Sequence, residues 1–574
     1  MKCYNFPVAD IFTIGIGGAA GDGAREAGYA FGSLLAELGY EVFVSLANPS
    51  LIRGGHNFTR LSFSSEKIWC DYIKLDVLIA LNEETITLHR NELEQSTIIF
   101  ADELTPAETA ARGANAVVLP MATAAAAVGA PAVARNSVAL GALGYLLALD
   151  FETLQKILQQ VFKDKQPELN IKLARLGFEF LEKTGRVIFK KIKPNQIKKE
   201  LIDGNTALAK GWLAAGLNFY IAYPMTPATS ILHFLAGEQK NRPKLKVIQP
   251  ENELAAINLA LGVAYAGQRV AVGSATGGFT LMQEAFSFAG GAELPLAVAV
   301  SQRQAPATGV PTFSSQADLR LAIHAGHGEF PRIVIAPGDA EESFLAGAGS
   351  LNLAWQYQIP VIVLMDKIVS EHPTTSQLAT DQIKIESGKT AGQTGSDYHR
   401  YQITDDGVSP LAFPGTPETV VKVNSYEHDE KGLTTETAEL VKAMLDKRFA
   451  KAKILATELD RQETIKIYGD KEADLAVIFW GSTKGSVMEA AKYFDRPVKL
   501  VQIVWLEPFD VKKVLAALAD VKKIINVEGN HNAQLAALIH EKTGRQVTKN
   551  ILKYDSRPFD PIELAQQINA FGYE

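Results

Sequence analysis

The sequence is poor in cysteine, in basic clusters and in long apolar segments. Its 574 residues include only two cysteines, Cys3 and Cys70, too few for a disulfide framework, a four-cysteine zinc site or an iron–sulfur cluster held by this chain alone. The 57 lysines and arginines face 64 aspartates and glutamates without forming a basic block, so nucleic acid is not an expected partner. No stretch of about twenty residues is apolar and uncharged enough to cross a bilayer. We therefore expect a cytoplasmic protein without a membrane partner.

Strand-like apolar runs alternate with helix-compatible segments in three parts of the chain, which predicts an α/β fold. The predicted parts cover residues 1–189, 201–430 and 473–574. A basic stretch at 190–200 is a predicted linker, and a charged helical stretch lies within 431–472. Between about Ser370 and His428 the chain is polar and glycine-rich, which predicts a long excursion over the surface.

The first part opens on GIGGAAGDG, Gly15 to Gly23, between an apolar run at 11–14 and a helix-compatible segment at 24–38. A strand, a glycine turn and a helix N-terminus together form an anion site. Dinucleotide-binding folds also need an acidic residue about 20 positions later, but the first charged residue after the second predicted strand is Arg53. This disfavours NAD or FAD. Three explanations of the glycine segment stay open. It could bind a different anion, it could be a loop that lines another site, or its glycines could serve only to allow close packing.

The second part carries the most informative residues. In YIAYPMTPATS, residues 220–230, two prolines flank Met225 and Thr226, so a stiff turn would present polar groups at the carboxyl edge of a parallel sheet. Glu251 and Glu253 follow the next predicted strand and start a helical pattern. Acidic residues are common in a first helical turn, so a cap and a catalytic carboxylate are both possible readings of each.

Together these segments resemble the 2-oxoacid:ferredoxin oxidoreductases, which use thiamine diphosphate. The segments AYPMTPATS, QPENELAAINLALGVAYAGQRVAV, ATGVPTFSSQADL and HGEFPRIVIAP are similar to the pyrimidine-binding domain of the family's alpha subunit. GIGGAAGDG and NPSLIRGGHNFTRLSFS resemble its γ domain, and LAVIFWGSTKGSVMEAA, LEPFD and NVEGNHNAQLAALI resemble its transketolase-like C-terminal domain. The resemblance spans nearly the whole chain in the family's order. It implies a γ domain at 1–189, a pyrimidine domain at 201–430 and a C-terminal domain at 473–574.

The resemblance also implies roles for individual residues. Glu253 would hold the aminopyrimidine ring of the cofactor, since its register fits the family better than that of Glu251. Thr226 would bond the substrate or its adduct, and Arg303 would bind the substrate carboxylate. Arg53 would reach the site from the γ domain. The residues implied in cofactor binding are Tyr223, Pro224, Thr226, Glu251 and Glu253, and those implied in a coenzyme A or anion loop are Gly17, Gly18 and Gly21.

Parts of the active site are expected on other chains. The letters GDG at residues 21–23 lack the surroundings of a magnesium–diphosphate motif, so no metal site is expected here. The resemblance implies a beta subunit that carries Mg²⁺ and a [4Fe–4S] cluster, a ferredoxin as electron acceptor, and a heterotetramer of two αβ pairs.

The implied reaction converts 2-oxoglutarate and coenzyme A into succinyl-CoA and CO₂, with electrons passed to ferredoxin. The γ–α arrangement and the segment YEHDEKG favour 2-oxoglutarate. Pyruvate, branched-chain and aryl 2-oxoacids stay open as substrates. Two other functions also stay open: a non-catalytic scaffold subunit, and a nicotinamide-dependent oxidoreductase that uses the first domain.

Overall fold

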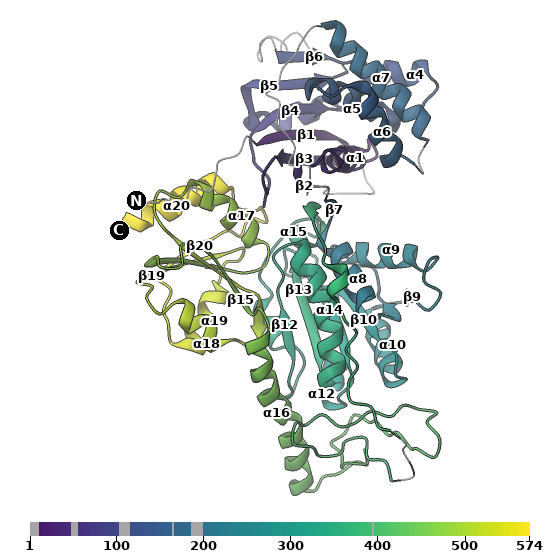
Figure 1. Ribbon diagram of the computed structural model, residues 1–574, viewed down its shortest axis with the longest axis vertical. Helices are drawn as coiled ribbons and strands as arrows, with labels where there is room; N and C mark the ends of the chain where they lie inside the picture. The colour runs from purple at the N-terminus through teal and green to yellow at the C-terminus, as the bar shows by residue number, and fades with distance from the viewer. Residues whose placement is uncertain are drawn as a thin grey trace.

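The computed structural model describes residues 11–47, 55–102, 115–163, 166–184, 199–392, 395 and 397–573. These residues form three α/β domains, each built on one sheet, which confirms the predicted fold class. The γ domain lies at one end of the molecule, above the pyrimidine domain and the C-terminal domain, which lie side by side (Figure 1).

The γ domain contains a sheet of eight strands within the described residues, in the order β6-β5-β4-β1-β3-β2-β14-β7. Its strands are β1 (Phe12–Ala19), β2 (Glu41–Ala47), β3 (His56–Ser64), β4 (Leu75–Ala80), β5 (Leu93–Ala101), β6 (Ala116–Val118), β7 (Glu200–Ile202) and β14 (Thr374–Ser376). Its helices are α1 (Ala24–Glu37), α2 (Glu83–Leu88), α4 (Met121–Ala127), α5 (Asn136–Leu146), α6 (Phe151–Val161) and α7 (Pro167–Thr184).

Strand β1 corrects the expectation that the glycine segment is a turn. The strand does not end at Ile14 but runs on through Ala19, paired with β3 along its whole length. The glycines fit a strand because a neighbour lies against it: a Cβ on Gly17 would lie 2.9 Å from Thr85 Oγ1. The turn before α1 therefore begins only at Ala20.

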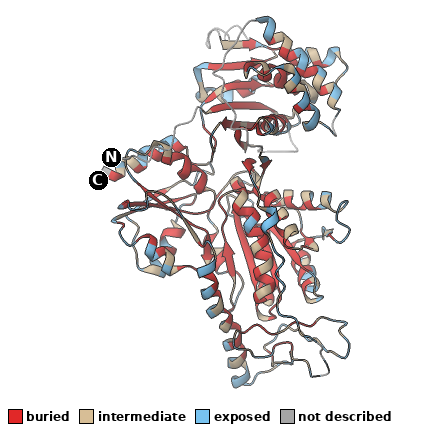
Figure 2. Cartoon of the chain, in the orientation of Figure 1, coloured by how far each residue is buried: buried red, intermediate tan, exposed pale blue. Residues whose placement is uncertain are grey.

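The pyrimidine domain has the strand order β18-β12-β13-β11-β10-β8-β9, and all its pairs are parallel except β12 with β18. Its strands are β8 (Phe219–Ile221), β9 (Lys246–Ile248), β10 (Val270–Ala275), β11 (Leu296–Gln302), β12 (Ile333–Ile335), β13 (Pro360–Asp366) and β18 (Trp505–Glu507). Its helices are α8 (Gly204–Ala214), α9 (Thr229–Glu238), α10 (Glu253–Tyr265), α11 (Thr276–Leu281), α12 (Gln283–Gly291), α13 (Leu319–Ile323), α14 (Ala340–Tyr357) and α15 (Lys367–Glu371). The central strands are buried along their length (Figure 2), as expected for continuous apolar runs covered by helices on both faces.

The C-terminal domain has the strand order β15-β17-β16-β19-β20, with only β15 antiparallel to its neighbour among the described strands. Its strands are β15 (Ile465–Gly469), β16 (Leu475–Phe479), β17 (Lys499–Ile503), β19 (Lys523–Glu528) and β20 (Lys549–Leu552). Its helices are α17 (Thr483–Ala490), α18 (Val511–Ala517), α19 (Gln534–Thr543) and α20 (Pro561–Tyr573).

The three sheets exchange strands across the domain boundaries. Strand β7 begins at Glu200, the last residue of the predicted linker, and β14 comes far later in the sequence, yet both belong to the γ sheet. The Val42 amide donates to Thr375 Oγ1 at 3.0 Å, and Lys67 Nζ donates to the Thr375 carbonyl at 2.7 Å. Because β14 is buried, the prediction of a surface excursion is wrong for residues 374–376. Strand β18 likewise comes from the C-terminal part of the chain and pairs with β12.

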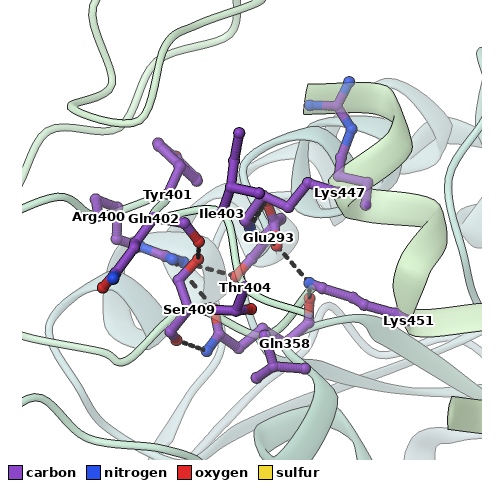
Figure 3. Close-up of polar contacts among 12 residues, drawn as sticks. Glu293, Gln358, Arg400, Tyr401, Gln402, Ile403, Thr404, Ser409, Lys447 and Lys451 are labelled. Carbon is purple, nitrogen blue, oxygen red and sulfur yellow. Dashed lines mark hydrogen bonds and ion pairs between the residues drawn. The ribbon is translucent and has the colours of Figure 1, made fainter. Parts of the chain in front are cut away.

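Helix α16 (Ala438–Arg461) is fixed to the pyrimidine domain by a buried charge cluster (Figure 3). Lys447 Nζ donates to both oxygens of Glu293, and Lys451 Nζ lies 2.5 Å from Glu293 Oε2. Burial alone would raise the pKa of the Glu293 carboxyl, but Lys447, Lys451 and Arg400 hold that pKa well below its ordinary value. Burial lowers the pKa of Lys451 to about 7 against the attraction of Glu293.

Candidate active site

The predicted site residues gather at one edge of the pyrimidine sheet. Strands β8, β9, β10 and β11 are parallel neighbours, so their carboxyl ends meet at the same edge. Thr226 follows β8, Glu253 follows β9 and Arg303 follows β11. Ligands of open α/β sheets bind at this edge.

Glu253 and Glu251, which the sequence does not separate, differ in the structure. Glu253 is the first residue of α10 and only 4% exposed, whereas Glu251 is exposed. The helix is capped by neither glutamate, because Asn252 accepts the Ala255 amide at 2.8 Å. The buried Oε1 atom of Glu253 has no hydrogen-bond partner among the described residues. A buried carboxylate without a partner is costly, so Glu253 has the surroundings of a group that binds a ligand.

Gly278 on α11 makes the room that the Glu253 carboxylate occupies. A Cβ at this position would lie 2.7 Å from Glu253 Oε1 and 2.9 Å from Glu253 Cγ, and would also collide with Ser274 Oγ. Ser274 lies near the end of β10, and its hydroxyl is 4.0 Å from Met225 Sδ in the loop after β8. Sequence reasoning missed the role of Gly278; the glycine pair at 277–278, one residue after the end of β10, is the signal that could have indicated it.

The loop between β8 and α9 holds the side chain of Arg303. Arg303 Nη1 donates to the Thr226 carbonyl at 2.8 Å, and the Thr226–Pro227 peptide bond is cis. Burial lowers the pKa of Arg303, but the side chain has no carboxylate within ion-pair distance in the part of the chain that the structure describes. A half-buried guanidinium without an ion pair is suited to bind an anion.

The remaining predicted site residues have different positions. Pro224 is half-buried and Tyr223 is exposed on the same loop as Thr226. Arg53 lies outside the described residues. In the ranges described, no group of three or more His, Cys, Asp or Glu side chains is arranged to hold a metal ion.

The protein itself supplies a carboxylate beside the glycine segment. Asp22 Oδ2 accepts the Ala19 amide at 2.8 Å, and Asp22 Oδ1 lies 3.0 Å from Arg135 Nη2. Gly17 and Gly18 lie within strand β1, and a Cβ on Gly18 would lie 2.8 Å from Asp22 Oδ2. Gly21 differs, because it has a φ of 100° and open space around its Cα.

Two family models match the chain. The model described as "Pyruvate flavodoxin/ferredoxin oxidoreductase, thiamine diP-bdg" covers residues 210–447, which include all the pyrimidine-domain site residues. The model described as "Pyruvate ferredoxin/flavodoxin oxidoreductase" covers residues 13–180 of the γ domain. The residues present fit thiamine diphosphate, since Glu253 supplies a buried carboxylate whose Oε1 has no partner within the described chain.

Curated relatives and a solved structure match nearly the full length. The 2-oxoacid:ferredoxin oxidoreductase subunit alpha of Sulfolobus sp. is 32% identical, with 96% of each chain covered. The 2-oxoglutarate synthase subunit KorA of Methanothermobacter marburgensis is 28% identical and covers 64% of this chain and 97% of its own. The 2-oxoglutarate:ferredoxin oxidoreductase from Magnetococcus marinus, solved with 2-oxoglutarate, coenzyme A and succinyl-CoA bound, is 31% identical with a TM-score of 0.88, and 98% of this chain and 99% of that chain are covered.

No helix among the described residues is both long enough and apolar enough to span a membrane. The buried Glu253, the half-buried Arg303 and the family matches in both domains agree on one assignment. The chain belongs to the 2-oxoacid:ferredoxin oxidoreductases and corresponds to their alpha subunit.

Proposed function

We propose that this chain forms the pyrimidine-binding half of an enzyme that converts 2-oxoglutarate and coenzyme A into succinyl-CoA and CO₂, with two electrons passed to ferredoxin. The observation that carries the proposal is the burial of Glu253 at the sheet edge that also holds Arg303, where Glu253 Oε1 has no hydrogen-bond partner in the described part of the chain. When bound, thiamine diphosphate supplies the carbon nucleophile and the electron sink.

Glu253 is the proposed acid–base residue. Its carboxyl group would hold a proton at a ring nitrogen of the aminopyrimidine and so favour the tautomer that removes the proton from the reacting carbon. Burial suits this role, because exclusion of water strengthens a hydrogen bond between the carboxyl group and the ring. Glu251 is exposed, and we assign it no proton transfer.

Arg303 is the proposed anchor of the substrate carboxylate. One of its nitrogens is used by the Thr226 carbonyl, which leaves other N–H donors of the guanidinium for a carboxylate. Thr226 lies beside this arginine and would contact the substrate or its adduct. We retain Arg53 as a further cation that reaches the site from the γ domain, and Tyr223 and Pro224 as residues that line the cofactor.

Exposed leucines on the helix that carries Glu253, and on the helix α11, are evidence that a partner subunit covers the site. Leu254 and Leu259 on α10 are 49% and 46% exposed, and Leu281 at the end of α11 is 52% exposed. These exposed apolar side chains lie on the two helices that border the site, and we count them as support for a protein interface there. We propose that the beta subunit covers them, supplies Mg²⁺ and a [4Fe–4S] cluster, and pairs with this chain in an assembly of two αβ units.

Coenzyme A is proposed to enter through a cavity of about 420 Å³ where the three domains meet. Its lining includes Ala47 at the end of β2, Lys367 directly after β13, and Arg557, whose guanidinium lies 3.6 Å from the centre of the Phe313 ring. Strand β13 is the neighbour of β11, so the cavity opens at the sheet edge that carries Arg303. We retain Gly17, Gly18 and Gly21 as γ-domain residues along the same route.

The substrate can be tested on the complex of this chain with its beta subunit. With coenzyme A and a ferredoxin, we expect the highest kcat/KM for 2-oxoglutarate, which is the 2-oxoacid named for the KorA relative and for the Magnetococcus marinus enzyme. A higher value for pyruvate, a branched-chain or an aryl 2-oxoacid would keep the reaction and change the substrate. A complex without bound thiamine diphosphate or activity would support the scaffold function instead.

A further inference from the structure

Asn205 is a fully buried residue in the first turn of α8, beneath the loop that follows β8. Its amide nitrogen Nδ2 donates to the Pro227 carbonyl at 2.8 Å and to Ser230 Oγ at 2.8 Å. Both donors of one side chain therefore bind the segment that contains Thr226. Asn205 belongs to no motif that the sequence comparison with the family uses, and its side chain lies behind the site rather than in it.

The peptide unit that Asn205 holds adjoins the one that holds Arg303. The Pro227 carbonyl accepts from Asn205, and the preceding carbonyl, that of Thr226, accepts from Arg303 Nη1 at 2.8 Å. Successive peptide units are rigid planes joined at one Cα atom. Because the Pro227 ring fixes φ, only the ψ torsion of Pro227 separates the two units, so the contact to the Pro227 carbonyl restricts the position of the Thr226 carbonyl and of the Arg303 guanidinium bound to it.

The loop has few bonds of its own that could fix it. Its internal backbone hydrogen bond joins the Ala228 amide to the Met225 carbonyl at 2.9 Å. Pro227 has no N–H to donate, and the Thr226 carbonyl is already used by Arg303. A side chain from another element must therefore hold the loop, and Asn205 supplies that contact.

Helix α8 is a rigid base for this contact. Asp203 caps the helix by accepting the Thr206 amide at 2.7 Å. Its glycines bring it against neighbouring backbone: a Cβ on Gly204 would collide with the Val369 carbonyl, and one on Gly211 would lie 2.9 Å from the Ala348 amide nitrogen in α14. Side chains on such packed helices hold their targets more accurately than loop residues can.

We propose that Asn205 is a positioning residue that sets the affinity for the 2-oxoacid. It would do so through its bond to the Pro227 carbonyl and, by way of the adjoining Thr226 carbonyl, through the position of Arg303. The inference rests on the proposed role of Arg303 as the anchor of the substrate carboxylate. Asn205 touches neither substrate nor cofactor in this scheme. Its effect is confined to the position of the arginine.

The test uses the complex with the beta subunit and the variant Asn205→Asp. This change keeps the size of the side chain but replaces the donating nitrogen Nδ2 with a carboxylate oxygen, which cannot donate a hydrogen bond to the Pro227 carbonyl. We expect kcat/KM for 2-oxoglutarate to fall about 10- to 100-fold, mostly through KM, with an unchanged KM for coenzyme A. Ser230→Ala is the matched control, because it removes the other acceptor of the same amide and leaves the bond to Pro227. We expect less than a threefold change for it.

A double-mutant cycle separates positioning from simple loss of structure. In the Arg303→Met background, Asn205→Asp should cost less than about threefold, because the group that Asn205 positions is gone. Equal costs in both backgrounds, or an equal rise in KM for coenzyme A, would overturn the inference. If Asn205→Asp does not fold, Asn205→Ser, which is too short to reach Pro227, enters the same cycle with the same criteria.

The cycle also keeps this inference apart from the proposed function. If Arg303→Met alone leaves kcat/KM for every 2-oxoacid unchanged, the proposed role of Arg303 fails. If Arg303→Met is strongly impaired but Asn205→Asp matches the wild type, only the role of Asn205 is refuted.

Discussion

The substitution Gly278→Ala should displace the Glu253 carboxylate without removing it, and so tests whether activity depends on the exact position of that group. In Gly278→Ala, the new Cβ would lie 2.7 Å from Glu253 Oε1, whereas ordinary contact begins at 3.4 Å. The carboxylate, which is buried at the start of α10, must therefore move by about 0.7 Å. Ser274 Oγ must give way too, because the new methyl group also collides with it.

The neighbouring Gly277 provides a matched control in the same helix. A Cβ there would meet no atom within 4 Å. Alanine is a better helix former than glycine by up to about 1 kcal/mol, so Gly277→Ala should be slightly more stable than the wild type and equally active. Gly278→Ala gains the same propensity but carries a packing cost of about 1 to 3 kcal/mol. A displacement near 1 Å in a catalytic group costs roughly 100-fold in rate, so we expect kcat/KM to fall by about 30- to 100-fold.

The measurement compares both variants in complex with the beta subunit. Steady-state rates with 2-oxoglutarate give kcat/KM, and deuterium exchange at the reacting carbon of bound thiamine diphosphate reports the proton transfer that Glu253 supports. Both should fall in Gly278→Ala, while thermal denaturation shows that the complex is folded. If Gly278→Ala stays within threefold of Gly277→Ala in both assays, Glu253 is not the acid–base residue or does not lie where the structure places it.

Three further substitutions test the site and the buried cluster. Glu253→Gln should lower proton exchange by several orders of magnitude with the cofactor still bound, because an amide cannot supply the proton; the reverse pattern, an inactive Glu251→Gln with an active Glu253→Gln, would assign the role to Glu251. Arg303→Met should cost about 2 to 5 kcal/mol in kcat/KM, equally for 2-oxoglutarate and pyruvate, and a loss confined to 2-oxoglutarate would place Arg303 at the distal carboxylate instead. The pKa of Lys451 is about 7 in the folded protein and 10.5 ordinarily. Between pH 7 and pH 10.5 the unfolded chain therefore binds more protons than the folded one, so the contribution of this group to the free energy of unfolding rises with pH. Between pH 7 and 9 the Tm of the wild type should therefore rise relative to Lys451→Met, while the exposed Lys453→Met follows the wild type; a constant difference from Lys451→Met would refute the titration.

The sequence predicts long central strands well and short or polar ones poorly. Strands β10, β11 and β13 are largely apolar runs that are buried along their whole length, and such runs can be recognised in the sequence. Strand β3 has no continuous apolar run by which the sequence could indicate it, because its buried faces include polar side chains such as Ser62, whose hydroxyl lies 3.1 Å from Thr13 Oγ1. Its stabilising partner is 49 residues away in sequence. Strands β7 and β14 have three residues each and exist through their pairing with distant segments.

In the candidate site, too, the sequence predicts some features and leaves others to contacts between distant segments. The residue types at Glu253, Thr226 and Arg303 follow from the sequence and its resemblance to a family. The choice between Glu251 and Glu253 depends on where the helix begins: Glu253 is its first residue, whereas Glu251 lies before the Asn252 cap and is exposed. The two positions are too close in the sequence for a periodicity to decide this. The proline at 227 predicts a stiff turn, but its contact with Asn205 follows from neither segment alone, since it arises only from the packing of α8 beneath the loop.

The shared γ sheet has a consequence for cutting the chain. Strand β14 lies between β2 and β7, so residues 200–202 and 374–376 complete a sheet whose other strands end before residue 119. A protein cleaved once within 185–198 would leave two of its γ strands on the C-terminal fragment. The two fragments should then stay bound and elute together, because separation would expose the edge of β2 to solvent. A gene divided at this point would have to protect that edge of the shorter product, by a further strand, a covering loop or charged side chains.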